Sequence, residues 1–295
     1  EQIMLSAPDG LDGEELERAL YLLRRRIEAR ATASGLQQFY ICSLSARSVI
    51  YKGMMLAQAL ADFYPDLSDP RVEANVALFH QRYSTNTFPE WRLAQPFRML
   101  AHNGEINTLR GNASWMRSHE IRMTAEAFGA DDATVKPVIQ AGGSDSAALD
   151  NVFEVLVRAG RPAPMVKALL MPEAPIEGLI SDDHRALYAY CNAVMEPWDG
   201  PAAICATDGR WVVAGKDRNG LRPLRVAETV DGLLICGSEV GMTGIADERI
   251  KRRLHIGGGR MISVDLAPGG LYAETQTVDR LAAADVESLQ QVSDV

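Results

Sequence analysis

The chain has 295 residues, and its 30 Lys and Arg against 39 Asp and Glu give a formal net charge of −9. Apolar residues make up 47% and charged residues 23%, values that are typical of a globular protein and argue against disorder. The acidity argues against a nucleic-acid partner, and no apolar run approaches the roughly 18 residues of a membrane-spanning helix. The N-terminus lacks the pattern of a secretory signal. We therefore expect a soluble, cytoplasmic protein with no nucleic-acid or membrane partner.

Four cysteines are present, and none of them forms a C-x-x-C motif or lies near a histidine at zinc-ligand spacing. They are Cys42, Cys191, Cys205 and Cys236. Each lies in an apolar run, where cysteine usually behaves as a small buried hydrophobe. We expect four reduced thiols and no metal site in this segment.

The first third of the chain predicts one long helix followed by short elements. Apolar residues at i, i+4, i+7 and i+11 predict an amphipathic helix over about 14–31. Two apolar stretches joined through Ala46 and Arg47 predict a β-hairpin over 38–54, and a short helix follows over 54–63. Two further strands are predicted over 72–84 and 96–103.

The middle of the chain predicts three helices. One runs from about Ile106 to Phe128, although Gly111 and Asn112 leave its start open. Ser144 or Asp145 is expected to cap the second. The apolar face of that second helix comprises Leu149, Val152, Phe153 and Leu156. Ser181 caps the third in the same way.

The last third predicts antiparallel strands. Asp208-Gly209 and Asp231-Gly232 each separate two apolar runs, and Asp-Gly suits the tight turn of a β-hairpin. A further strand is predicted over 260–266. With helices in the middle and hairpins at both ends, we expect an α+β fold. We expect one domain over 1–275 and a polar tail or linker over 276–295.

Three polar clusters interrupt the apolar pattern, over 81–91, 101–112 and 140–151. Arg82 in the first offers a planar fork that suits a carboxylate. Asn103-Gly104 in the second can supply a side-chain amide and a backbone N–H to an oxyanion. Asp145 in the third can hold an ammonium group. Taken alone, the first two clusters are more typical of a surface arginine and an ordinary Asn-Gly turn, and the third is equally typical of a helix cap.

Together and in this order the clusters resemble the class II glutamine amidotransferases, members of the N-terminal-nucleophile hydrolases, as found in the large subunit of glutamate synthases. The matching stretches are RYSTNTFPEWRLAQPFRMLAHNGEINTLRGNASWM, GGSDSAALDNVFEVLVRAGR, MEPWDGPAAICATDGRWVVAGKDRNGLRPLR and CGSEVG. The resemblance extends from about 39 to 265. It implies a four-layer αββα sandwich of two antiparallel sheets.

The resemblance also implies roles for individual residues. Arg82 is expected to bind the α-carboxylate of L-glutamine, helped by Thr85 and Asn86. Asp145 is expected to bind the α-ammonium group, with Gly143 beside it. The side-chain amide of Asn103 and the backbone N–H of Gly104 form the implied catalytic pair, which stabilises the tetrahedral oxyanion. The run from Asp217 to Pro223 is expected to form a wall of the site.

The family's nucleophile is a cysteine at the mature N-terminus, whose own α-amino group serves as the base. This sequence begins with Glu1, and none of its four cysteines is placed to substitute. We therefore expect a fragment whose fold is incomplete at the N-terminus. By itself the fragment is expected not to hydrolyse glutamine.

The implied reaction is hydrolysis of L-glutamine to glutamate and ammonia, and the ammonia passes to a synthase domain of the same polypeptide. There 2-oxoglutarate is aminated and reduced with FMN and an iron–sulfur cluster, with electrons from a reducing subunit or ferredoxin. Neither cofactor is expected in this segment. Two alternatives stay open: an inactive glutamine-binding regulatory module, and a class II amidotransferase that feeds another synthase. The segments GEINTLRGN and MEPWDGP argue against the second alternative.

Overall fold

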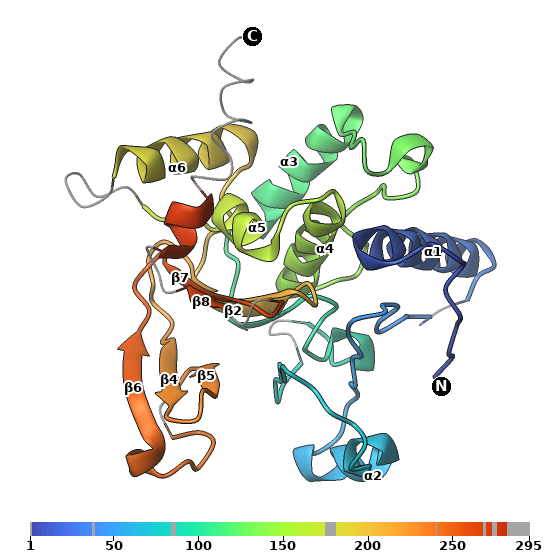
Figure 1. Cartoon of the computed structure of the whole chain (residues 1–295). Coiled ribbons are helices and arrows are strands. Elements are labelled where there is room, and N and C mark those ends of the chain that lie inside the picture. Colours follow the sequence, from blue (N-terminus) through green and yellow to red (C-terminus); the bar gives the residue numbers. More distant parts are fainter. Residues whose placement is uncertain are drawn as a thin grey trace.

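A computed structural model of the chain describes residues 2–36, 39–83, 87–174, 181–239, 241–267, 270–272 and 276–281 (Figure 1). The α-helices are α1 (Gly13–Ala33), α2 (Leu60–Phe63), α3 (Leu109–Arg122), α4 (Asp145–Arg158), α5 (Ala163–Leu170) and α6 (Asp182–Val194). The strands are β1 (Leu100–Gly104), β2 (Ala202–Thr207), β3 (Trp211–Lys216), β4 (Arg225–Thr229), β5 (Leu234–Gly237), β6 (Ile250–His255), β7 (Met261–Asp265) and β8 (Gly270–Tyr272). None of the described helices combines the length and the apolar character needed to span a lipid bilayer.

The strands form two antiparallel sheets. The first has five strands in the order β1-β2-β3-β7-β8, and the second has three in the order β5-β4-β6. In the first sheet, Asn103 lies opposite Ala203, which in turn lies opposite Lys216. The predicted α+β class with two antiparallel sheets is confirmed.

The five-stranded sheet lies between helices on one side and the three-stranded sheet on the other (Figure 1). Leu100, Ile204 and Val213 face the helices and share a core with Leu149 and Phe153 of α4. The alternate residues of the same strands face the second sheet in a smaller core. That smaller core comprises Ala203, Ala214, Leu224, Val226, Ile256 and Ile262. No described helix contributes a residue to it, so the described residues supply three layers of the expected four.

The capped helices form where the sequence predicts them. α4 begins after Ser144, whose Oγ accepts a hydrogen bond from the Ala147 N–H at 3.1 Å. α6 begins after Ser181, whose Oγ accepts from the His184 N–H at 3.3 Å. Such bonds satisfy N–H groups that have no partner within the helix. The predicted long N-terminal helix is confirmed as α1.

Two predictions in the first third are wrong. Residues 39–54 and 72–83 contain no β-strand, apart from a single bridge between Tyr83 and Ala94. Side chains hold the first of these segments instead. Ser45 donates to Glu17 of α1 at 2.9 Å, and Lys52 donates to the Arg92 carbonyl at 2.8 Å. Apolar composition therefore favoured strands that find no partner in either sheet.

Three elements have no counterpart in the prediction: α5, β6 and β8. β6 contains the charged run 251–253, which the alternation rule does not identify as a strand. This run lies on an exposed face, and Lys251 and Arg252 pair with Glu228 of β4. The packed chain also continues past the expected boundary at 275, because Val278 and Leu281 belong to the larger core. The rest of the predicted tail lies outside the described residues.

Candidate active site

β1 is an edge strand, and its outward N–H groups need partners other than a neighbouring strand. The Met99 carbonyl accepts from Thr207, and the Glu105 N–H donates to Pro201, so these positions bond toward β2. The N–H groups of the alternate residues of β1 point away from β2. The Leu100 N–H donates to Asp150 Oδ1 at 3.2 Å, and the His102 N–H donates to Gln95 Oε1 at 2.7 Å.

Gly104 is the next position in this outward series, so its N–H is directed away from the sheet. Its φ is +130°, a conformation that favours glycine. A Cβ atom added here would lie 1.7 Å from the carbonyl oxygen of Pro201. Only glycine therefore fits, and it leaves an open backbone N–H at the end of β1.

The Asn103 side chain lies on the face of the sheet that is turned toward β4–β6, in the row shared with Ala203 and Lys216. Its Nδ2 donates to Ser238 Oγ at 3.0 Å. Ser238 directly follows β5, in the stretch CGSEVG. The second sheet thus orients the amide that the sequence assigns to the oxyanion.

Asp145 is half-buried at the first position of α4. Its Oδ1 accepts from the Ser146 N–H at 2.7 Å, and its Oδ2 accepts from the Ile106 N–H at 2.9 Å. A carboxylate has about four lone-pair sites, so this carboxylate retains acceptor capacity. Asp145 therefore connects α4 to the end of β1 and can accept a further donor.

Arg82 is exposed, and its backbone is fixed. Its carbonyl accepts from the Gln95 N–H at 3.3 Å, and its N–H donates to His80 Nδ1 at 3.0 Å. Within the described ranges its guanidinium makes no hydrogen bond or ion pair. Thr85 and Asn86 lie outside the described residues.

Three sets of contacts bring the predicted clusters together, although they lie up to about 60 positions apart in the sequence. Gln95 bonds the Arg82 backbone and, through its side chain, both backbone groups of His102. Arg92 donates to the Gly142 carbonyl at 2.8 Å, beside the exposed Gly143. The bond from the Ile106 N–H to Asp145 connects the second cluster directly to the third. We call Arg82, Asn103, Gly104, Gly143 and Asp145 the candidate site.

His102 is a feature of this region that the sequence interpretation did not select. It is 96% buried on β1, and its Nε2 has no hydrogen-bond partner within the described part of the chain. Burial lowers its pKa, although the charge of Asp145 acts in the opposite direction. The Asp217–Pro223 run begins near the site, since the Asp217 N–H donates at 2.9 Å to the carbonyl of Ala202, which lies opposite Gly104. The signal in the sequence was a histidine directly before Asn-Gly at a strand end.

None of the four cysteines has the environment of a nucleophile. All four are free thiols. Burial raises the pKa of Cys205 to about 11 and that of Cys236 to about 12, and it also raises the pKa of Cys42. Cys191 is fully buried. An activated thiol has a lowered pKa and an accessible sulfur, so these side chains are structural.

The comparison with known families decides the identity of this fold. The model of the class II glutamine amidotransferases matches residues 1–287. The chain belongs to this family.

The relatives that this chain resembles are glutamate synthases. The chain is 57% identical over 283 residues to the NADPH-type glutamate synthase large chain of Azospirillum brasilense, covering 96% of this chain and 19% of that one. It is 42% identical to the corresponding chain of Bacillus subtilis, covering 95% and 19%. It is 41% identical to ferredoxin-dependent glutamate synthase 2 of Synechocystis, covering 90% and 17%. The chain therefore spans about a fifth of the length of these relatives.

Proposed function

We propose that this chain is the glutaminase part of a glutamate synthase and binds L-glutamine in the candidate site. The observation that carries the proposal is the arrangement around the end of β1. Hydrogen bonds link the backbone of Arg82, the carboxylate of Asp145 and the strand that carries Gly104. Among the described residues the Arg82 guanidinium has no partner, while the Asp145 carboxylate has spare acceptor capacity and the Gly104 N–H points outward. A zwitterionic amino acid with a reactive amide needs one cation, one anion and an oxyanion site.

In this proposal the two charged residues fix the ends of the substrate. The Arg82 guanidinium binds the α-carboxylate of glutamine with two parallel hydrogen bonds. Asp145 accepts from the α-ammonium group with the lone pairs that Ser146 and Ile106 leave open. Thr85, Asn86 and Gly143 complete the substrate pocket, as the family resemblance implies.

Asn103 and Gly104 act on the reacting amide. A thiolate attacks the side-chain carbonyl carbon of glutamine, and its oxygen becomes an oxyanion that accepts from Asn103 Nδ2 and the Gly104 N–H. As this intermediate collapses, the C–N bond breaks, the nitrogen takes the proton that the thiol gave up, and ammonia departs, leaving a thioester. Water then cleaves the thioester to glutamate and restores the thiol. The buried thiols described above do not suit this role, so the proposal requires a cysteine other than these four.

The proposal extends to the rest of the enzyme. Ammonia passes to a synthase domain of the same polypeptide, which aminates 2-oxoglutarate with FMN, an iron–sulfur cluster and electrons from a reducing subunit or ferredoxin. Residues outside this chain hold these cofactors in the proposal. Among the described residues, no group of three or more His, Cys, Asp or Glu side chains is placed to hold a metal ion. We also propose a cytoplasmic location.

Glutamine hydrolysis by the full-length polypeptide that contains this chain tests the proposal. Arg82→Ala and Asp145→Asn are each expected to raise the KM for glutamine about 10- to 100-fold, since a hydrogen bond to a charged group contributes roughly 1.5–3 kcal/mol. Arg117→Ala, at an exposed position on α3, is the matched control and is expected to change nothing. Unchanged glutamine affinity in both site variants contradicts the assignment. Binding without hydrolysis in the wild type favours the regulatory module instead.

A further inference from the structure

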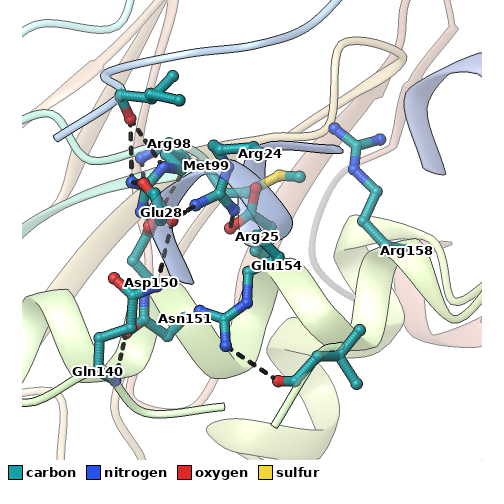
Figure 2. A network of polar contacts seen from close by, with 12 residues as sticks. Arg24, Arg25, Glu28, Arg98, Met99, Gln140, Asp150, Asn151, Glu154 and Arg158 are labelled. Carbon is teal, nitrogen blue, oxygen red and sulfur yellow. Dashed lines mark hydrogen bonds and ion pairs between the residues drawn. The ribbon is translucent and has the colours of Figure 1, made fainter. Parts of the chain in front are cut away.

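Asp150 of α4 contacts the start of β1 through three consecutive backbone groups. Its carboxylate accepts from the N–H groups of Arg98 at 3.2 Å and Met99 at 2.8 Å, two residues that Figure 2 labels beside it. It also accepts from the Leu100 N–H at 3.2 Å. The side chain is 99% buried. A buried N–H without a partner is unfavourable, so these bonds determine where the strand begins.

The same helix holds the other end of the strand. Asp145 binds the Ile106 N–H just beyond β1, five positions before Asp150 on α4. Because Asp150 binds the start of the strand and Asp145 its end, α4 runs antiparallel to β1. The oxyanion donors of Asn103 and Gly104 lie between these two attachment points.

Charged side chains of α1 and α4, together with that of Arg98, surround Asp150, and no ion pair among the described residues joins them to its carboxylate. Arg24 pairs with Glu28 and Glu154, and Arg98 pairs with Glu28 at 2.7 Å (Figure 2). We call Arg24, Glu28, Arg98, Asp150 and Glu154 the buried network. Because both arginines pair with glutamates, the carboxylate of Asp150 is left to the three backbone N–H groups.

We propose that Asp150 is a positioning residue, which holds β1 at the register in which Asn103 and Gly104 meet the oxyanion while Asp145 holds the substrate. This inference rests on the proposed function. A shift of the strand start by a fraction of an ångström moves both donors relative to Asp145, and catalytic constellations tolerate only about 0.5 Å. The loss is expected in the transition state, where the oxyanion forms, more than in substrate binding.

The protonation of Asp150 provides a signature of this role. Burial and the neighbouring Glu154 raise its pKa to about 6. As the pH falls through 6, the carboxylate gains a proton and loses acceptor capacity for the strand. The titratable and charged groups around it are Glu154 of α4, Arg24 and Glu28 of α1, Arg98, and Tyr40 and Lys52 of the irregular segment. Of these, Glu154 opposes the ionised form most strongly.

The test compares Asp150→Asn with Glu154→Gln in the full-length polypeptide. Both remove one buried negative charge from α4, but only Asp150 contacts β1. Asp150→Asn is expected to lower kcat for glutamine hydrolysis about 10- to 100-fold with KM nearly unchanged. The wild type is expected to lose activity as the pH falls through 6, and Asp150→Asn is expected to abolish this loss. Glu154→Gln is expected to keep kcat and to move that loss to lower pH, since it removes the repulsion.

Hydrogen exchange over 98–106 separates this inference from the proposed function. Faster exchange there in Asp150→Asn, with β4–β6 unchanged, supports the attachment whether or not glutamine is hydrolysed. If the wild type hydrolyses no glutamine, the proposed function fails and exchange alone decides the role of Asp150. An unchanged kcat in Asp150→Asn, or an equal fall in both variants, overturns the inference. If Asp150→Asn does not fold, Asp150→Glu replaces it and is expected to lower kcat by displacing the carboxylate.

Discussion

The buried network and the candidate site lie at opposite ends of β1 and treat charge differently. In the network, Arg24 is 98% buried and is paired with two carboxylates. In the candidate site, Arg82 is exposed and unpaired among the described residues, and Asp145 has spare acceptor capacity. A charged side chain whose hydrogen-bonding capacity is filled by other protein groups therefore stabilises the fold. Where they do not fill it, the side chain is available to a ligand.

The largest expected effect tests the network. Arg24→Ala leaves Glu28 and Glu154 as buried carboxylates without this cation, which is expected to lower the free energy of unfolding by about 3–5 kcal/mol. Arg82→Ala is the counterpart in the candidate site and is expected to change it by less than about 0.5 kcal/mol. Urea-dependent hydrogen exchange of α1 and α4 measures both. Equal effects would remove the distinction between the two regions.

The next effect tests the backbone of the candidate site. Gly104→Ala places a methyl group against the Pro201 carbonyl and requires a strained φ, so the N–H must move. We expect glutamine hydrolysis to fall by about 10²–10³-fold, as when an oxyanion donor is removed. Gly111→Ala is the control, because nothing lies within 4 Å of the added atom in α3. It is expected to stabilise the helix by about 0.5–1 kcal/mol and to leave activity unchanged.

A third prediction concerns a buried cation outside both regions. Lys167 of α5 is fully buried and donates to the carbonyls of Met171 and Gly259, and burial lowers its pKa to about 7. Between pH 7 and its ordinary value of 10.5, the unfolded chain binds more protons at this residue than the folded chain does. Stability from this group is therefore expected to rise with pH, by at most about 1.4 kcal/mol per unit. Lys167→Met is expected to remove that slope in urea titrations at pH 7, 8 and 9, and an unchanged slope would assign it to other groups.

The smallest effect is expected at an exposed ion pair. Arg26 and Asp131 lie 2.5 Å apart, with side chains 55% and 35% exposed. Arg26→Ala is expected to lower the free energy of unfolding by about 0.2–1 kcal/mol, because water and salt screen such pairs. The free energy of unfolding, measured at low and high salt, checks this prediction. A loss as large as that of Arg24→Ala would show that burial does not determine how much an ion pair contributes to stability.

Local sequence patterns predicted the elements whose geometry is local. Asp208-Gly209 and Asp231-Gly232 predicted both hairpins correctly, because a tight turn selects its residues within the turn itself. Ser144 and Ser181 marked the starts of two helices, because a cap acts over three residues. The strands expected over 38–54 and 72–84 do not form within the described residues 39–54 and 72–83, because an apolar stretch becomes a strand only when another strand pairs with it.

For the candidate site, the sequence alone determined the chemistry: a guanidinium, a carboxylate, an amide and a glycine, in the order typical of one family. Only the tertiary structure decided how they are joined. Gln95, Arg92, Ser238 and Asp150 make these connections, and they do so mainly through backbone carbonyl and N–H groups. Every residue except proline carries both of these groups, so contacts to them leave no signature in the sequence. They are fixed only when packing brings distant segments to the same edge of the sheet.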